Sequence, residues 1–173
     1  MEDLKKAIRE VPDFPKEGIL FYDITTLLAD PGAFRKVVDH LAERYKDKKP
    51  DRIVAIDARG FIFGGALAYV LGTGFTPVRK KGKLPGETVK ASYELEYGVD
   101  EVEMHRDQVC KGERVVVIDD LLATGGTAKA VADLVGQCGG EVIEYAFLIE
   151  LDFLKGRDKL EGLPVYSVLH YND

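Results

Sequence analysis

The sequence predicts an α/β fold in which a parallel sheet is flanked by helices, and two strand–loop–helix units carry this prediction. Residues 115–118 form a continuous β-branched run, which is typical of a strand buried on both faces. The loop after this run leads into residues 128–135, whose apolar side chains recur with helical spacing. Residues 52–56 and 61–71 repeat the same order, and successive units of this kind build a parallel sheet.

Composition fits one domain that spans residues 1–173. Hydrophobic residues make up 46% and charged residues 31%, as in ordinary globular proteins, and the chain is long enough to bury a full core. The net charge of −6 argues against a protein that binds nucleic acid or an anionic membrane, because such proteins need a basic surface.

Cysteine content and the N-terminus predict a cytoplasmic location. Cys110 and Cys138 are too few for a disulfide framework or a zinc site, and they fit small buried or half-buried residues of a reducing compartment. The first ten residues lack the apolar core of a secretory signal. No apolar run approaches the length of a membrane span.

The first thirty residues predict a short helix and then an irregular segment. Residues 4–11 place their apolar side chains on one side of a helix, and Pro12 and Pro15 end it. Residues 14–31 fit neither a regular helix nor a regular strand, although residues 18–22 are largely apolar. Such a segment either packs against the core or lines a pocket for a flat ligand.

The middle of the chain alternates helices and strands. We expect a helix at 33–45, a strand at 52–56, a helix at 61–71 and a strand at 74–78. Two glycines at 64–65 predict close packing of the second helix on the sheet.

A basic cluster, Arg79 to Lys83, follows the strand at 74–78 in an otherwise acidic protein. Such clusters are usually solvated. This one follows a strand end, however, and ligands bind beyond the carboxyl ends of parallel strands. With Arg59, it could neutralise a polyanion such as pyrophosphate.

Residues 88–106 alternate polar and apolar side chains around a turn at 97–100, which predicts a β-hairpin. This hairpin is either a solvated sheet edge or a lid over a ligand site. Residues 141–149 and 164–171 predict two further strands.

The loop after residue 118 has the chemistry of a site for a phosphorylated ligand that carries hydroxyl groups. The glycines at 125–126 let the backbone approach the ligand, and free N–H groups at a helix start stabilise a phosphate. The hydroxyls of Thr124 and Thr127 can donate further hydrogen bonds, and Thr127 could cap the helix. Asp119 and Asp120 stand where the strand should end. Because carboxylates repel phosphate, they should face sugar hydroxyls or a cation held by the ligand.

The segment VVVIDDLLATGGT at 115–127 resembles the phosphoribosyl-pyrophosphate (PRPP) binding signature of the type I phosphoribosyltransferases. Five other blocks resemble the adenine-specific members of that family, in the expected order over nearly the whole chain: FPKEGILFYDITTLL, DARGFIFG, RKKGKLPGET, SYELEYG and PVYSVLHY. The resemblance implies the type I phosphoribosyltransferase fold. It adds an irregular N-terminal hood at about 12–30, with a C-terminal contribution, and a β-hairpin lid at about 84–107.

The resemblance also implies which residues hold PRPP. The loop for the 5-phosphate comprises Ala123, Thr124, Gly125, Gly126 and Thr127, and the clamp for the ribose hydroxyls comprises Asp119 and Asp120. Groups that approach pyrophosphate would be Arg59, Lys80 and Lys83, Arg79 nearby, and the backbone of Asp57 and Ala58, where the family often has a non-proline cis peptide. Magnesium would arrive on PRPP and not sit in a cage of protein ligands.

For the base, the resemblance implies a hood of Leu20, Phe21 and Tyr22, with Leu151 on the opposite face and Glu96 and Tyr97 from the lid. The family usually has a basic residue at the position of Tyr22, so that assignment depends on whether the backbone or the side chain does the recognition.

The implied activity is purine salvage, in which adenine and PRPP give AMP and pyrophosphate with magnesium. The acidic pair would stabilise an oxocarbenium-like state, and Glu96 would manage the proton on the purine. A homodimer is expected by resemblance alone. Two alternatives stand beside this reading: a transferase for another 6-substituted purine, and a non-catalytic sensor of PRPP or purine.

Overall fold

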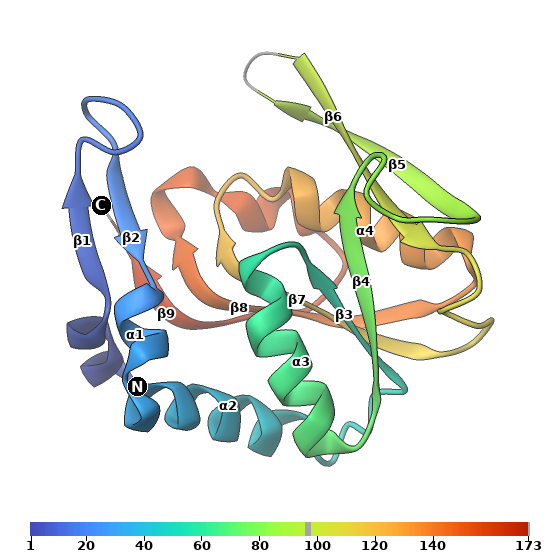
Figure 1. Ribbon diagram of the computed structural model, residues 1–173, viewed down its shortest axis with the longest axis horizontal. Helices are drawn as coiled ribbons and strands as arrows, with labels where there is room; N and C mark the ends of the chain where they lie inside the picture. Colours follow the sequence, from blue (N-terminus) through green and yellow to red (C-terminus); the bar gives the residue numbers. More distant parts are fainter. Residues whose placement is uncertain (96–97, 173) are drawn as a thin grey trace.

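The computed structural model describes residues 1–95 and 98–172. Over these residues, seven strands form one sheet, two strands form a small second sheet, and helices cover both faces of the larger sheet (Figure 1). The elements in chain order are η1 (Glu2–Ala7), β1 (Arg9–Pro12), β2 (Leu20–Asp23), α1 (Thr25–Ala29), α2 (Pro31–Tyr45), β3 (Arg52–Ile56), α3 (Arg59–Leu71), β4 (Gly74–Lys80), β5 (Thr88–Leu95), β6 (Gly98–His105), β7 (Arg114–Leu122), α4 (Gly126–Gln137), β8 (Glu141–Leu151), η2 (Asp152–Leu154), η3 (Gly156–Leu160) and β9 (Val165–Tyr171).

The larger sheet has the order β5-β6-β4-β3-β7-β8-β9. Its centre is parallel: β3 pairs with β4 and β7, and β8 pairs with β7 and β9. The β5–β6 hairpin extends the sheet through two antiparallel pairs, Arg79 opposite Glu103 and Lys80 opposite Val102. The predicted fold class, a mostly parallel sheet between helices, is confirmed.

Alternate residues of the central strands divide the core between the two faces. Ile53 and Ala55 of β3 pack with α2 and α3, while Val54 and Ile56 pack with α4 and the base of the hairpin. All four side chains are buried, as expected for a strand covered on both faces. Burial on both faces explains why the β-branched runs predicted these strands correctly.

The predicted end of β7 was wrong. The strand continues from Arg114 to Leu122, so Asp119 and Asp120 lie within it and do not follow it. The parallel neighbour β8 runs on to Leu151 and supplies the partners, with Asp119 opposite Phe147 and Leu122 opposite Glu150. Because a neighbouring strand offers hydrogen bonds, polar side chains alone do not end a strand.

The N-terminal prediction needs a similar correction. Residues 4–11 do not form one helix, because η1 ends at Ala7 and Ile8 adopts extended dihedral angles (φ −98°, ψ 128°). β1 then pairs antiparallel with β2, and Arg9 forms an ion pair with Asp23 across the two strands. The segment at 14–31, which was predicted to be irregular, is therefore partly regular, since it contains β2 and α1. The local hydrophobic pattern did not predict β2, because β2 is stabilised by pairing with β1, which lies earlier in the chain.

Both helices before the site begin two residues earlier than predicted. Asp30 caps α2 by accepting hydrogen bonds from the N–H groups of Gly32 (2.8 Å) and Ala33 (3.1 Å), and a proline at the first helical position suits such a start. α3 starts at Arg59, directly beyond β3. Gly64 permits the predicted close packing, because a Cβ there would lie 2.6 Å from the Cβ of Ala55.

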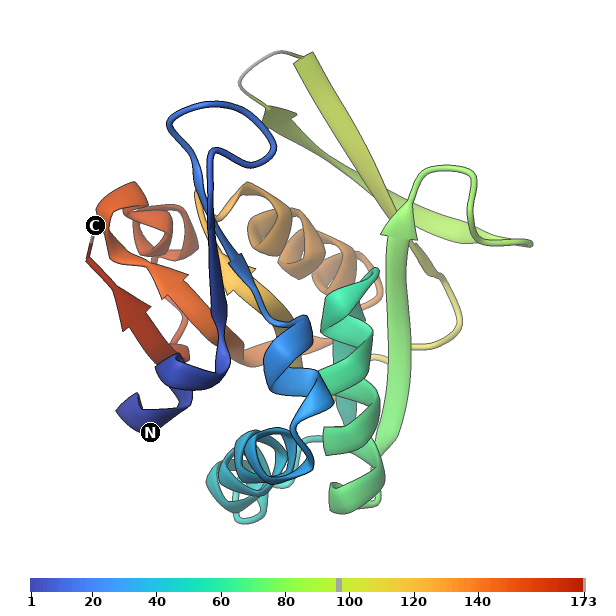
Figure 2. The ribbon, with the colours of Figure 1, turned by 60° about the vertical axis from the view of Figure 1, so that its left-hand side comes forward.

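The two hairpins stand at the same end of the molecule in both views of the ribbon (Figures 1 and 2). β1–β2 lies beside β9, and β5–β6 lies beyond β4, so they flank the carboxyl ends of the central strands. The predicted hairpin at 88–106 is confirmed as β5–β6, but its turn was placed wrongly, because residues 98–100 belong to β6 and pair with β5. The action of the hairpin as a lid stays a prediction.

The two cysteines differ in their exposure. Cys138 is half-buried as expected, but Cys110 is exposed, because it lies in the loop between β6 and β7. Among the described residues, no helix combines the length and the apolar character needed to cross a membrane.

Candidate active site

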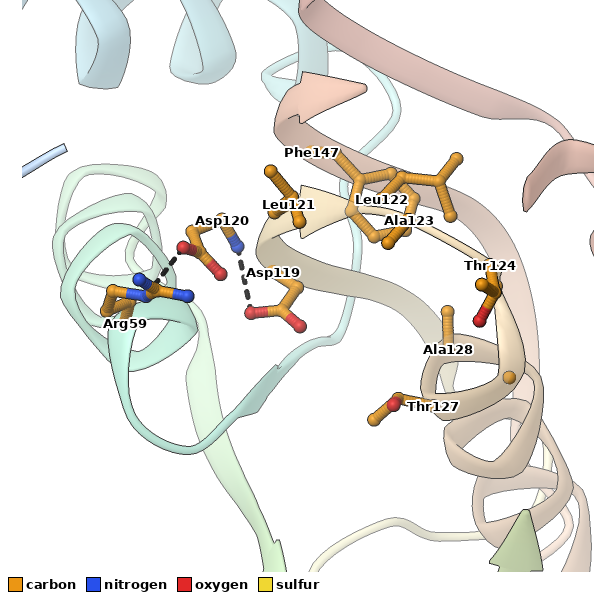
Figure 3. A pocket seen from close by; sticks show the side chains of 12 residues that line it. Arg59, Asp119, Asp120, Leu121, Leu122, Ala123, Thr124, Thr127, Ala128 and Phe147 are labelled. Carbon is orange, nitrogen blue, oxygen red and sulfur yellow. Dashed lines mark hydrogen bonds and ion pairs between the residues drawn. The ribbon is translucent and has the colours of Figure 1, made fainter. Parts of the chain in front are cut away.

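Two cavities adjoin at the carboxyl ends of β3, β4 and β7, and they share Arg59, Asp119, Asp120 and Thr127. The first, of about 240 Å³, is closed by the loop that joins β7 to α4. Figure 3 shows Arg59 and the acidic pair on one side of this cavity and Thr124 and Thr127 on the other. We call the first cavity the loop cavity and the second, toward β4, the basic cavity.

The loop of the first cavity is held in place by close backbone packing. Gly125 has φ +81°, and a Cβ there would lie 2.3 Å from the carbonyl oxygen of Gly156. A Cβ on Gly156 would lie 2.2 Å from the carbonyl oxygen of Ala123. Glycine is therefore required on both sides of this contact. η3, which contains Gly156, supports the loop from behind.

The N-terminus of α4 opens into the loop cavity. Its cap is Gly125, with no side-chain hydrogen bond, so the suggestion that Thr127 caps the helix was wrong. Thr127 lies one residue inside the helix and lines both cavities. The first N–H groups of a 12-residue helix are thus left for a ligand.

The acidic pair carries more negative charge than its one cationic partner offsets. Arg59 Nε lies 2.7 Å from Asp120 Oδ2, and the backbone N–H of Asp120 donates to Asp119 Oδ1 at 2.8 Å. Gly60 fixes the other side of Asp119, because a Cβ there would lie 2.9 Å from Asp119 Oδ1. Burial, and then the neighbouring Asp120 carboxylate, raise the pKa of Asp119 well above its ordinary value.

The basic cavity, of about 230 Å³, gathers three cations, each beside a carboxylate. Arg79 Nε lies 2.8 Å from Asp57 Oδ2, and Lys80 Nζ lies 2.8 Å from Asp100 Oδ2. The third pair is Arg59 with Asp120. An incoming anion would therefore exchange partners with these carboxylates.

Backbone geometry also shapes the basic cavity. The peptide bond between Asp57 and Ala58 is cis, as the resemblance implied, and both residues line the cavity. Lys83 is not among the lining residues. It lies on the turn after β4, where its carbonyl oxygen accepts a hydrogen bond from Arg79 at 3.3 Å.

The predicted base-binding residues differ in exposure. Leu20 is exposed, and Phe21 is half-buried with its ring centroid 5.5 Å from the guanidinium carbon of Arg59. Tyr22 is buried, and its ring centroid lies 4.0 Å from that of Tyr171. The structure thus brings Phe21 beside Arg59 and buries the side chain of Tyr22 against β9. Leu151 is half-buried at the end of β8.

Two of the predicted residues lie outside the described part of the chain, and the sequence prediction missed several residues that line the cavities. Glu96 and Tyr97 lie outside the described residues. Tyr93 and Val102 of the hairpin line the basic cavity, and Phe147 of β8 lines the loop cavity. The alternation along β5 could have signalled Tyr93, because it shares a face with the apolar Val89 and Ala91.

The donor set suits a divalent cation that arrives with its ligand. The two neighbouring carboxylates offer the hard oxygen atoms that magnesium prefers, and one arginine offsets part of their charge. Within the described residues, three potential ligands gather only at Glu150, Asp152 and His170. Arg157 already holds both oxygens of Glu150, at 2.5 and 2.7 Å, so that group is better explained as a structural ion pair.

Comparison with known proteins identifies the family. A model of the phosphoribosyl transferase domain matches residues 23–165. The adenine phosphoribosyltransferase of Solibacter usitatus is 59% identical over 172 residues, which cover 99% of each chain.

Solved structures agree. That of the adenine phosphoribosyltransferase from Thermoanaerobacter pseudethanolicus has a TM-score of 0.95 at 54% identity, covering 98% of this chain and 99% of that one. The Saccharomyces cerevisiae enzyme, complexed with adenine and an imino-altritol bisphosphate, has a TM-score of 0.91 at 48% identity, with 96% and 97% covered. These three relatives share 48–59% of the residues over nearly the whole of each chain, and the two solved structures share the fold, so the chain belongs to the adenine phosphoribosyltransferase family.

Proposed function

We propose that this protein transfers the 5-phosphoribosyl group from PRPP to adenine and releases AMP and pyrophosphate. One observation carries the proposal: two adjoining cavities share an acidic pair, and each has a different means of binding phosphate. PRPP has a single phosphate at one end of its ribose and a pyrophosphate at the other. The sugar would then lie over Asp119 and Asp120, between the two anionic groups.

The 5-phosphate belongs in the loop cavity. The loop at 123–127 is fixed by the close packing of Gly125 on the backbone of Gly156. The free N–H groups of α4 begin directly after Gly125. Hydroxyls of Thr124 and Thr127 face this cavity and can donate further hydrogen bonds (Figure 3). The positive end of the helix dipole favours a dianion there.

Asp119 and Asp120 act on the ribose in two ways. As carboxylates they accept hydrogen bonds from the 2- and 3-hydroxyls, and this contact explains why they tolerate a position between phosphates. Loss of pyrophosphate leaves positive charge on the sugar. Negative potential from the pair stabilises that charge in a site partly shielded from water.

The pyrophosphate group belongs in the basic cavity. Arg59, Arg79 and Lys80 supply positive charge there, and Lys83 follows on the adjoining turn. Magnesium bound with PRPP would neutralise oxygens of the leaving group beside the acidic pair. The residues of the chain orient the group and offset its remaining charge.

Adenine belongs under the hood. Leu20 and Phe21 offer an apolar surface, Leu151 offers another, and backbone groups near Leu20 and Tyr22 can form hydrogen bonds with the edge of the base. The complex of the yeast relative with adenine supports this choice of base. Glu96 would take part in proton transfer at the purine, and Tyr97 would contact the substrate from the lid. A homodimer and a cytoplasmic location likewise stay predictions.

Turnover with adenine, hypoxanthine and guanine, each with PRPP and magnesium, tests the proposal. We expect nucleotide and pyrophosphate to form with adenine and at most slowly with the other bases. Omission of magnesium should suppress the reaction. Turnover of hypoxanthine but not adenine would replace adenine by another 6-substituted purine, and binding of PRPP without turnover would identify a sensor.

Substitution of the acidic pair tests the placement of the sugar. Asp120→Asn should raise the KM for PRPP and lower kcat by at least about 10-fold, because a hydrogen bond to a charged group is lost along with charge stabilisation. Adenine binding should change little. Asp133→Asn is the matched control, because Asp133 is exposed on α4 and forms an ion pair with Lys129 at 3.1 Å. If Asp120→Asn weakens adenine more than PRPP, the placement is wrong.

A further inference from the structure

Tyr93 is the side chain through which β5 of the lid reaches the basic cavity. It lines that cavity together with Arg79, Lys80 and Thr127. Its ring also covers the start of α4, because a Cβ on Gly126 would lie 3.7 Å from Tyr93 Cδ2. Tyr93 therefore stands between the phosphate loop and the cations of β4, and the activity proposed above assigns it no role.

The hydroxyl of Tyr93 belongs to a short chain of polar contacts. It donates to Asp100 Oδ2 at 3.2 Å, and the same oxygen lies 2.8 Å from Lys80 Nζ. Tyr93 and Asp100 are directly opposite each other in the β5–β6 ladder, so the register of the hairpin sets this contact. A phenol and an ammonium thus share one carboxylate at the rim of the cavity.

The phenol is a proton donor at neutral pH. Burial raises the pKa of Tyr93 above its ordinary value, although Thr127 and Lys80 act in the opposite direction. Lys80 stays charged, because the hydrogen bond and the charge of Asp100 raise its pKa. Both groups can therefore donate to an anion that enters the cavity.

We propose that Tyr93 binds substrate directly, by donating its hydroxyl hydrogen to an oxygen of the pyrophosphate group of PRPP in place of Asp100. This inference rests on the proposed function, since it assigns the anion in the basic cavity to PRPP. Pyrophosphate carries more charge than a single carboxylate, so it competes well for both donors. Because Lys80 and Tyr93 share Asp100, one ligand group can take both over.

Other neighbours of the cavity fit this exchange. Asp57 is occupied by Arg79 and Asp120 by Arg59, so these two carboxylates are already paired beside the entering anion. Asp119 faces the ribose side of the cavity. Asp100 is the carboxylate next to the hydroxyl, and the exchange moves both of its donors to the ligand.

Tyr93→Phe tests the proposal, because it removes the hydroxyl and keeps the ring that packs on α4. We expect the KM for PRPP, and the Kd for inorganic pyrophosphate with magnesium, to rise about 10-fold, as for one lost hydrogen bond to a charged group. The KM for adenine should stay within about two-fold. Tyr69→Phe is the matched control, because Tyr69 is 88% exposed on α3.

The outcomes separate this inference from the proposed function. A wild-type protein that does not make AMP overturns the proposed function. An active wild type whose Tyr93→Phe variant keeps its affinity for PRPP and pyrophosphate overturns the inference alone. Equal rises in the KM for adenine and for PRPP also overturn it, because they would show a general disturbance of the site.

Asp100→Asn tests whether Tyr93 acts through its carboxylate partner. Direct contact predicts that pyrophosphate binding stays the same or tightens, because a competing charge is removed. Weakening as large as that of Tyr93→Phe would make Asp100 the group that positions the cavity, and would overturn direct contact. Calorimetric titration with pyrophosphate and magnesium measures both variants without turnover.

Discussion

The position of Asp119 lowers the free energy of unfolding of the protein without substrate, because its carboxylate lies next to that of Asp120. Asp119 is half-buried beside Asp120, and among the described residues one arginine pairs with the two acids. Sugar hydroxyls and a ligand-borne cation would relieve this repulsion. The residue is therefore suited to binding at some expense of stability, as is common at functional sites.

We predict that Asp119→Asn raises the melting temperature of the free protein. Its folded-state pKa lies above the unfolded value of about 3.8, so the stability linked to protonation is present below that pH and is lost as the pH rises. Each kcal/mol regained should add about 2–4 °C for a chain of this size. Asparagine can still accept the hydrogen bond from the N–H of Asp120.

Calorimetry of both proteins at pH 4 and at pH 7.5 measures this effect. The gap between the variant and the wild type should be small at the lower pH and larger at the higher one. A gap of the same size at both would show that ionisation of Asp119 is not its cause. Asp133→Asn on the exposed face of α4 serves as the control for a lost surface charge.

At the scale of elements, η3 and the phosphate loop form one unit because their backbones touch. We predict that Gly156→Ala raises the KM for PRPP and lowers kcat by about 10-fold or more, because a 1 Å displacement of a positioning group can cost about 100-fold. The added Cβ would meet the carbonyl oxygen of Ala123 at 2.2 Å and the Leu122 side chain at 2.9 Å. Steady-state kinetics with each substrate varied in turn measures the change.

Gly136→Ala provides the control for this substitution. Gly136 is exposed in α4, and a Cβ there meets nothing within 4 Å. Alanine should stabilise the helix by up to about 1 kcal/mol and leave the KM for PRPP unchanged. If both variants show the same kinetics, contact between η3 and the loop does not position the phosphate.

The elements also show what could be predicted from the sequence. β-branched runs such as residues 115–118 predicted the buried strands, because burial on both faces demands apolar residues throughout. β1 and β2 could not be predicted in this way, since their pairing joins residues up to fourteen positions apart, as Arg9 with Asp23 shows. The true end of β7 depended on the length of β8, which is again non-local.

In the candidate site, too, the sequence predicted the residues of one local segment and did not predict contacts between distant segments. Loop chemistry predicted the glycines, threonines and carboxylates at 119–127, and these residues do line one cavity. For Tyr93, the alternation along β5 indicates the face on which it lies, but its place in the site depends on the register of the hairpin and on the packing of β5 on α4, which are non-local. The burial of Tyr22 against Tyr171 likewise depends on β9, which lies far along the chain.

For the whole molecule, a buried ion pair distant from the site joins α2 to the sheet. Glu144 of β8 is 2% exposed and receives two hydrogen bonds from Arg44, at 2.8 and 2.7 Å, and one from Lys48 at 3.0 Å. Burial alone would raise the pKa of Glu144, but these hydrogen bonds hold it below its ordinary value. The pair therefore stabilises the fold above the unfolded-state pKa of about 4.5 and loses this effect as the pH falls.

We predict that Arg44→Met destabilises the protein by about 3 kcal/mol at neutral pH, because it removes both hydrogen bonds of the guanidinium and leaves Lys48 and Tyr45 beside the Glu144 carboxylate. The difference from wild type should shrink in acid, and kcat should not change. Urea unfolding at pH 7.5 and pH 4 measures it. Lys46→Met, which breaks an exposed pair with Glu43, should destabilise the protein far less, because solvent screens that pair. Equal losses from the two variants would contradict the role of burial.

The ion pairs of the basic cavity also bear on how fast an anionic substrate arrives. Arg59, Arg79 and Lys80 each lie beside a carboxylate, and the chain as a whole carries a net charge of −6. If the substrate is PRPP, as proposed, it would diffuse toward a protein of its own sign whose site cations attract little at a distance. We expect its association rate to hold steady or rise as ionic strength increases from about 0.01 M to about 0.15 M, whereas exposed cations would make it fall. Stopped-flow mixing measures this rate, and a steep fall would mean that the cations are open before the substrate arrives. The protein would then select PRPP only once it touches the site, where its phosphates replace the carboxylates as ionic partners of the three cations. Long-range electrostatic steering would contribute little.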